Sequence, residues 1–199
     1  MIIDKDIFNL LEAQPEPQAG DIIIAEPFLV DPFFSRSCVL LTKHSEEIDS
    51  MGFVINNKLD CSLTDIFPDI ETSVDIPMFL GGPMSTDRLF FIHDFDYAIP
   101  GATPIVEGIS MCGDFGVVKE ILTSQPESSL HFKFFIGYSG WSKGQLAEEL
   151  SNHTWAVGKT IPHKLIMTVD TDDLWRGCVA SLGDKYKNWL ACPDSPSLN

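Results

Sequence analysis

The sequence contains few basic residues. Lys and Arg together number 13, against 29 Asp and Glu, so the formal net charge is −16. An acidic surface repels phosphate backbones, whereas most DNA-binding proteins depend on cations that release counterions. We therefore expect no direct binding to nucleic acid. Because the acidic residues are spread along the chain and not gathered in a tail, we interpret their excess mainly as a contribution to solubility.

Paired cysteines are also absent from the sequence. The five thiols are widely separated, their number is odd, and none forms a Cys-x-x-Cys pair: Cys38, Cys61, Cys112, Cys178 and Cys192. This spacing argues against a disulfide framework and against a zinc ribbon. We expect reduced thiols, with Cys38 as a small core residue. The histidines are scattered as well, so we expect no bound metal and no cofactor.

The sequence has neither a spanning segment nor a secretion signal. No apolar run approaches the ~18 residues that a membrane-spanning helix requires. Residues 1–6 alternate charged and apolar side chains, and they lack the basic region and apolar run of a signal peptide. We therefore expect a cytoplasmic protein without membrane partners.

Motifs of known catalytic sites are incomplete in this chain. The segment Gly137-Tyr138-Ser139-Gly140-Trp141 is similar to a Gly-x-Ser-x-Gly nucleophile elbow, but the bulky Trp141 would crowd the tight turn. The last histidine, His163, also precedes Asp170, Asp172 and Asp173, so these late acids do not fit the usual Ser, acid, His order. The turn at Gly81-Gly82-Pro83 lacks the pattern of a phosphate-binding loop. We interpret it first as a tight turn and second as an anion site.

The composition is that of a globular domain with a substantial core. Hydrophobic residues make up 44% of the 199 residues, including 14 Phe and 4 Trp. No linker divides the chain, so we predict one domain over residues 20–190. Residues 1–19 should form a helix over 6–13 and a linker, because Pro15 and Pro17 follow its apolar pattern. The segment 191–199, rich in Pro and Ser, should be a disordered tail.

Strand and helix patterns alternate without regular βαβ repeats, which favours an α+β fold. The predicted strands are 21–26, 37–42, 51–56, 78–80, 88–93, 106–111, 131–136 and 165–169. The predicted helices are 63–67, opened by Ser62, 115–122, opened by Asp114, and 173–182. A further helix should begin near Lys143, because Ser142 and Gln145 have the spacing of a capping box. Trp141 would then pack on Leu146 as a hydrophobic staple.

Four motifs along the chain resemble the YqgE/AlgH family of bacterial proteins. They are Phe34-Ser35-Arg36-Ser37, the strand from Met51-Gly52 to Asn56, the unit from Gly81-Gly82-Pro83 to His93, and the signature from Gly137 to Leu150. The likeness runs from about Gly20 to about Leu182. It implies a single α+β domain with a small closed or flattened β-barrel, or a mixed sheet, flanked by helices. The family has no settled enzymatic activity, and part of its name comes from a proposed transcriptional regulator of alginate synthesis.

The candidate site residues carry amide, aromatic, glycine and guanidinium groups, which suit recognition better than bond cleavage. They are Arg36, Asn56, Gly81, Gly82, His93, Tyr138, Ser139, Trp141 and Gln145. Arg36 and Asn56 could equally cap loops, His93 could be a structural histidine, and Trp141 with Trp155 could be core. We favour a non-catalytic regulatory or binding protein that contacts an unknown protein or small molecule. The alternative is a hydrolase-like enzyme with a site built from His93, Asn56, Ser139 and Glu149.

Overall fold

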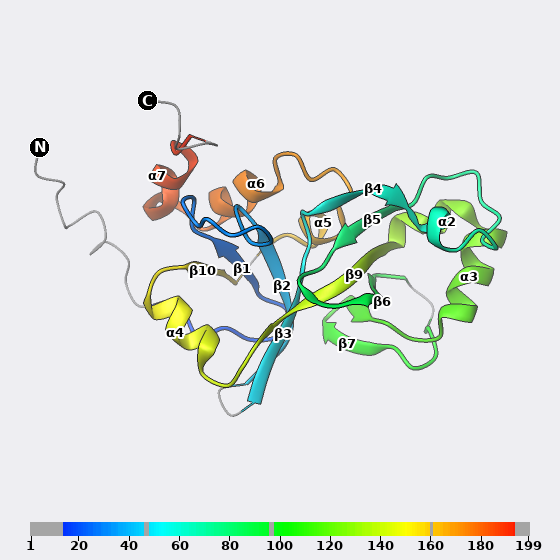
Figure 1. Cartoon of the computed structure of the whole chain (residues 1–199), viewed down its shortest axis with the longest axis horizontal. Coiled ribbons are helices and arrows are strands. Elements are labelled where there is room, and N and C mark those ends of the chain that lie inside the picture. Colours follow the sequence, from blue (N-terminus) through cyan, green and yellow to red (C-terminus); the bar gives the residue numbers. More distant parts are fainter. Residues whose placement is uncertain (1–13, 46–47, 96–97, 160, 194–199) are drawn as a thin grey trace, which may run out of the picture.

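The computed structural model describes residues 14–45, 48–95, 98–159 and 161–193, and within them ten strands form one sheet (Figure 1). In chain order the strands are β1 (Ile22–Ala25), β2 (Cys38–Ser45), β3 (Ile48–Val54), β4 (Lys58–Ser62), β5 (Pro77–Leu80), β6 (Met84–His93), β7 (Thr103–Val106), β8 (Ile109–Met111), β9 (Phe132–Trp141) and β10 (Trp155–Gly158). The predicted helix over 6–13 and most of the predicted tail lie outside the described residues.

Six short α-helices flank the described sheet. They are α2 (Leu63–Ile66), α3 (Phe115–Ser124), α4 (Gln145–Ser151), α5 (His163–Met167), α6 (Leu174–Ser181) and α7 (Lys187–Leu190). Two 3₁₀ turns, Pro126–His131 and Asp184–Tyr186, precede β9 and α7. The predicted caps form, since Asp114 accepts from the backbone N–H groups of Gly116 and Val117, and the N–H of Ser62 donates to Asp65.

The described residues contain one mainly antiparallel sheet and six helices, which confirms the α+β class.

The sheet is open, and the barrel expected from the family resemblance does not form. Its main path runs β10-β1-β2-β3-β9-β6-β8-β7, and within the described residues its two end strands do not pair with each other. The neighbours on this path are antiparallel, but β5 runs parallel to β9 and carries β4 on its other edge. The mixed-sheet form of the prediction is thus the one that the structure adopts.

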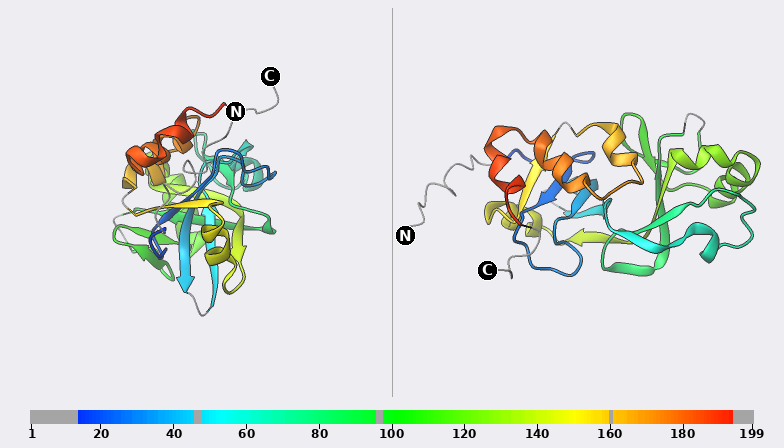
Figure 2. Two further views of the ribbon diagram at one scale, coloured as in Figure 1. Left: turned by 90° about the vertical axis from the view of Figure 1, so that its left-hand side faces the viewer. Right: turned by 90° about the horizontal axis from the view of Figure 1, so that it is seen from above.

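Strand β9 joins two halves of the molecule, which lie side by side along its long axis (Figures 1 and 2). Its first half pairs with β5 and β6 through residues 132–136, and its last three residues pair with β3. One half contains β10, β1, β2 and β3 with α4, α6 and α7. The other contains the remaining strands with α2 and α3. The halves are further joined by hydrogen bonds of Val54 to Gly81 and of Leu80 to Asn57, and the first buried cluster has members in both.

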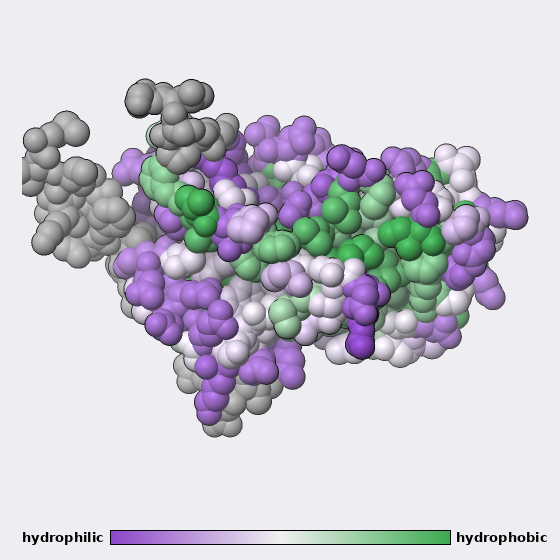
Figure 3. All heavy atoms as spheres, viewed as in Figure 1, coloured by the Kyte–Doolittle hydropathy of each residue, from purple (hydrophilic) through white to green (hydrophobic). Residues whose placement is uncertain are grey.

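Three buried clusters follow from side chains that alternate across the strands. In β1, Ile22 and Ile24 face one cluster while Ile23 and Ala25 face another, and all four are fully buried. Helix α6 covers the first face and α4 the second, which explains why β1 is a continuous apolar run. The third cluster lies under α3. Figure 3 shows hydrophobic residues at the surface over α2 and β5, where this third cluster is only partly covered.

Two predicted strands are wrong. Residues 165–169 were expected to be a strand because of their apolar and β-branched run, but helix α5 occupies Leu165 to Met167. Pro162 precedes the first residue of α5 and suits a helix start, and Ile166 and Met167 are buried in the first cluster. The predicted strand 106–111 is a hairpin instead. Gly108, with φ of +80°, turns the chain between β7 and β8.

The signature segment also differs from its prediction, because the strand does not stop at Gly137. It continues to Trp141, and Gly137 with φ of +69° marks where β9 changes partners. A Cβ on Gly137 would lie 2.7 Å from the carbonyl oxygen of Gly82 and 2.8 Å from that of Met84. Helix α4 then begins at Gln145, two residues later than predicted, with Gly144 as its N-cap.

The close approach at Gly137 leads to a stability prediction. Gly137→Ala should lower the free energy of unfolding by about 2 kcal/mol or more, because it combines a left-handed backbone with contacts to two carbonyl oxygens. Gly140→Ala is the matched control. Gly140 has no positive φ, and its Cβ would meet the edge of the Tyr138 ring at 3.3 Å and the Met84 side chain at 3.8 Å, with no backbone atom among these contacts. Urea denaturation of both variants measures the difference, and equal losses would contradict this role for Gly137.

Candidate functional site

The Gly81-Gly82 turn and Ser139 form a backbone crossing, not a ligand site. Ser139 is fully buried, and its hydroxyl donates to the carbonyl oxygen of Gly81 at 2.9 Å. The same carbonyl accepts from the N–H of Val54. A Cβ on Gly82 would lie 2.4 Å from the Ser139 hydroxyl oxygen, so the two segments touch. The Gly81-Gly82 segment is thus packed directly against Ser139, and the Ser139 hydroxyl is not exposed.

Trp141 is a core residue held by a carboxylate. It is 4% exposed and lies edge-to-face with Trp155, their ring centroids 6.0 Å apart. The indole N–H groups of both rings donate to one oxygen of Glu149, at 2.8 and 2.7 Å. Gln145 donates to the other oxygen of Glu149 at 2.9 Å. Trp141 also shares its buried cluster with Leu146, as the predicted staple requires.

The remaining signature residues are structural too. Tyr138 is half-buried and lies edge-on to Phe90, with 5.7 Å between the ring centroids. The side-chain oxygen of Gln145 accepts from the N–H of Ser142 at 3.0 Å, which is one half of the predicted capping box. The signature therefore connects β9, α4 and β10.

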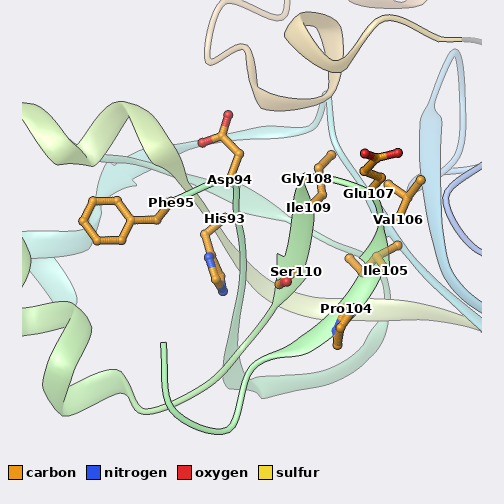
Figure 4. A pocket seen from close by; sticks show the side chains of 10 residues that line it. All are labelled: His93, Asp94, Phe95, Pro104, Ile105, Val106, Glu107, Gly108, Ile109 and Ser110. Atoms are coloured by element: carbon orange, nitrogen blue, oxygen red, sulfur yellow. The ribbon is translucent and has the colours of Figure 1, made fainter. Parts of the chain in front are cut away.

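His93 is a buried histidine beside a shallow pocket (Figure 4). It is 4% exposed and packs against the rings of Phe91 and Phe132, and neither of its ring nitrogens has a hydrogen bond of good geometry. Burial lowers the pKa of His93, because removing the charged imidazolium from water costs more free energy than removing the neutral ring. Asp94 points to the opposite side and accepts from His131 at 2.9 Å. The structure agrees with a structural His93, although without the expected hydrogen bond.

The four residues of the enzyme hypothesis do not meet. His93 pairs with Phe132, and Ser139 lies seven residues further along β9, roughly 20 Å away at the rise of a strand. Glu149 is engaged by the two tryptophans, and Asn56 by the backbone near β2. Among the described residues, no cluster of three or more His, Cys, Asp or Glu side chains could hold a metal ion.

Arg36 and Asn56 lie together in the structure, a contact that the sequence motifs did not predict. The Asn56 side chain accepts from the N–H of Cys38 at 2.8 Å and donates to the carbonyl oxygen of Arg36 at 2.9 Å. Arg36 has φ of +49°, a left-handed conformation that is costly for a residue with a Cβ. Its guanidinium carbon lies 4.6 Å from the ring centre of Trp175. Backbone, amide and aromatic ring thus fix the position of this arginine.

A polar cleft of about 510 Å³ lies beside this arginine, and we call it the Arg36 cleft. Its lining comes from the loop before β2, the start of β4 and the start of α6: Ser35, Arg36, Asn56, Asn57, Lys58, Thr171, Asp172, Asp173, Trp175 and Arg176. Three of the 13 basic residues of the chain gather here with two aspartates. The cleft therefore differs in charge from the acidic average of the protein.

The two arginines of the Arg36 cleft contact peptide carbonyl groups near the end of the described chain. Arg36 donates to the carbonyl oxygens of Cys192 and Pro193 at 3.0 and 2.6 Å. Arg176 donates to that of Leu190 at 2.9 Å. These donors are arranged for oxygen acceptors, which is what a recognition site for carboxylates or peptide groups requires.

Sequence reasoning missed Lys133, a lysine buried in the aromatic part of β9. It is 1% exposed, and its ammonium group lies 4.3 Å from the ring centre of Phe79. It donates to the carbonyl oxygens of Thr168 and Ile166, at 2.5 and 3.4 Å, where α5 ends. Burial lowers its pKa to about 7. The signal available in the sequence was a single lysine among three phenylalanines and an isoleucine in residues 132–136.

Residues 22–187 match the family model described as AlgH-like, which covers more than half of the chain. The chain belongs to the AlgH-like family. A UPF0301 protein of Bacteroides thetaiotaomicron is 41% identical over 199 residues, with full coverage of both chains. A UPF0301 protein of Chlorobium phaeobacteroides is 30% identical and covers 92% of this chain and 96% of its own.

Two solved structures of this fold are similar to the whole chain. Protein DIP2367 of Corynebacterium diphtheriae has a TM-score of 0.75 at 21% identity, covering 95% of this chain and 98% of its own. The AlgH protein of Pseudomonas aeruginosa has a TM-score of 0.68 at 23% identity, covering 92% and 98%. These likenesses confirm the fold. Within the described residues, no helix has the length and apolar character needed to cross a bilayer.

The shared carboxylate of Glu149 leads to a prediction. Glu149→Ala should lower the free energy of unfolding by about 2–4 kcal/mol, because two largely buried indole N–H groups lose their acceptor. Glu148→Ala is the matched control, since Glu148 is exposed on the same helix and should change stability by less than about 0.5 kcal/mol. Urea denaturation followed by tryptophan fluorescence reports both. A small loss in Glu149→Ala would show that water can replace the carboxylate.

The lowered pKa of Lys133 leads to a prediction about pH. Between about pH 7 and its ordinary pKa of 10.5, the unfolded chain binds the Lys133 proton and the folded chain does not, so this residue makes stability rise with pH. Below pH 7 the cost of the buried ammonium is fully present. Lys133→Met should therefore stabilise the protein by a few kcal/mol at pH 6, and by less at pH 9.

The control for this experiment is Lys164→Met, which removes a lysine that is exposed. Chemical denaturation at pH 6, 7, 8 and 9 gives the difference from the unmodified chain for each variant, so contributions from other titrating groups cancel. A difference for Lys133→Met that does not change with pH would contradict the lowered pKa.

Proposed function

We propose that this protein is a non-catalytic binding protein and that the Arg36 cleft is its ligand site. The observation that carries the proposal is the way Arg36 is held. The left-handed backbone of Arg36 is held by a hydrogen bond from the Asn56 side-chain amide to the Arg36 carbonyl oxygen, and its guanidinium lies over the Trp175 ring. Strained backbone of this kind is found mainly where function needs a fixed group. A restricted arginine also loses less conformational entropy when it binds.

The charges of the Arg36 cleft define the chemistry of its ligand. Arg36, Arg176 and Lys58 offer donors to carboxylate, phosphate or carbonyl oxygens. Asp172 and Asp173, both exposed at the start of α6, offer acceptors. The ligand that fits best carries anionic oxygens together with hydrogen-bond donors. The contacts to three carbonyl groups of residues 190–193 support this choice.

A regulatory role is part of the proposal, because the family resemblance implies one and the cleft suits recognition. Any link to transcription would be indirect, since the net charge of −16 opposes direct DNA binding. The cytoplasmic location stays a prediction from the sequence.

The proposal is tested by NMR with acetate and inorganic phosphate as probes. In the ¹⁵N-labelled full chain, the side-chain Nε–Hε signals of Arg36 and Arg176 should shift saturably as either anion is added. The signal of Arg88, which is exposed outside the cleft, serves as the control and should move little. Arg36→Lys should weaken binding about tenfold, because lysine cannot reproduce the planar fork of the guanidinium. Equal shifts at all three arginines would refute a specific site.

A further inference from the structure

The Arg36 cleft is one end of a longer groove that runs around the loop between β1 and β2. A hollow of about 350 Å³, lined by Phe28, Leu29 and Val30 among others, lies at the far end of this loop. A smaller hollow of about 230 Å³ lies beside Pro32 and Asn56. Ser35 lines both of them and the Arg36 cleft, so the three hollows adjoin one another at this residue, and we call the row of three the groove. The groove changes from apolar at Val30 to charged at Arg176.

The apolar end of the groove exposes large side chains on a loop that is held by its own hydrogen bonds. Val30 is 91% exposed and Phe28 is 50% exposed. The loop that carries them is held from within, because one oxygen of Asp31 accepts from the backbone N–H groups of Phe33 and Phe34 at 2.8 and 3.0 Å. Phe34 packs against Trp155, with 5.6 Å between the ring centroids. Exposed apolar groups on an ordered loop are typical of an interaction site.

Arg36, which lines the charged end of the groove, already binds polypeptide backbone. Arg36 donates to two successive carbonyl groups of this chain, those of Cys192 and Pro193. The guanidinium of Arg36 can therefore bind peptide carbonyl groups, and a partner peptide would take the place of these two. Beyond it, Lys58 and Arg176 place positive charge near the end of such a peptide.

From these observations we infer that the groove binds an extended segment of a partner protein. In this arrangement an apolar side chain of the partner contacts Phe28 and Val30, and an acidic side chain lies toward Arg36, Lys58 and Arg176. The inference rests on the proposed function, because it uses the Arg36 cleft as its charged end. It adds the class of ligand, a polypeptide, and a second contact region outside that cleft. Recognition by one apolar anchor and one charged anchor is a common way to bind short peptides.

The test selects peptides from a random display library on the immobilised full chain. Enriched peptides should carry an aliphatic or aromatic residue a few positions from an Asp or Glu. A synthetic peptide of the enriched sequence is then measured by fluorescence anisotropy. The Phe28→Ser/Val30→Ser double variant should weaken its binding at least tenfold, and Arg36→Lys should do the same. All of these positions are at least partly exposed, so the variants should fold, which circular dichroism checks.

Two matched variants control for the loss of exposed apolar surface. Val106→Ser and Leu130→Ser replace side chains that are 41% and 71% exposed and lie outside the groove, and binding should not change. Peptides that need Arg36 but not Phe28 or Val30 would overturn the groove while leaving the ligand site in place. Peptides indifferent to all these positions, or no enrichment at all, would also overturn it, and the phosphate titration then decides separately whether the Arg36 cleft binds ligands.

Discussion

The structure depends on a close contact between backbones where β9 changes its partners. The pairing of β9 with β5 ends at Ile136, Tyr138 makes its last pair with β6, and pairing with β3 begins at Ser139. Between them, at Gly137, the carbonyl oxygens of Gly82 and Met84 occupy the space of a side chain. Ser139 then closes the contact with a hydrogen bond to Gly81. Because β9 is shared by both halves of the sheet, this crossing contributes to their relative position. The same crossing explains why these residues offer no ligand site.

The sequence could predict those elements whose signals are local. Alternating or continuous apolar runs identified the strands at Ile22 and Cys38, and Asp114 identified the start of α3, because caps and periodicity act within a few residues. The prediction of a strand at residues 165–169 was wrong for a physical reason. Its apolar side chains suit a strand or a helix equally, and the deciding interactions come from distant residues such as Lys133, which donates to the end of α5. The open sheet could not be inferred either, since closure depends on pairing between strands far apart in the chain.

The candidate site was predicted in part. Arg36 and Asn56 were identified from their motifs, and the structure places them together, but Trp175 and Arg176 join them from about 120 residues further along the chain. No spacing rule connects such positions. His93, Ser139 and Trp141 were singled out because their residue types are chemically versatile, and each of them is buried at 4% exposure or less. Residue type alone therefore identifies site residues less well than their burial and position in the fold do.

The Arg36 cleft is built on the core of both halves of the molecule. One wall contains Arg36, whose carbonyl oxygen accepts from the Asn56 side chain. The carbonyl oxygen of the next residue, Asn57, accepts from the N–H of Leu80 at the end of β5. The other wall, from Thr171 to Arg176, follows directly after the α5 terminus that Lys133 holds. Lys133 in turn lies on β9, four residues before Gly137. A change at the crossing would therefore move both walls, so the geometry of the cleft is tied to the contact that organises the whole sheet.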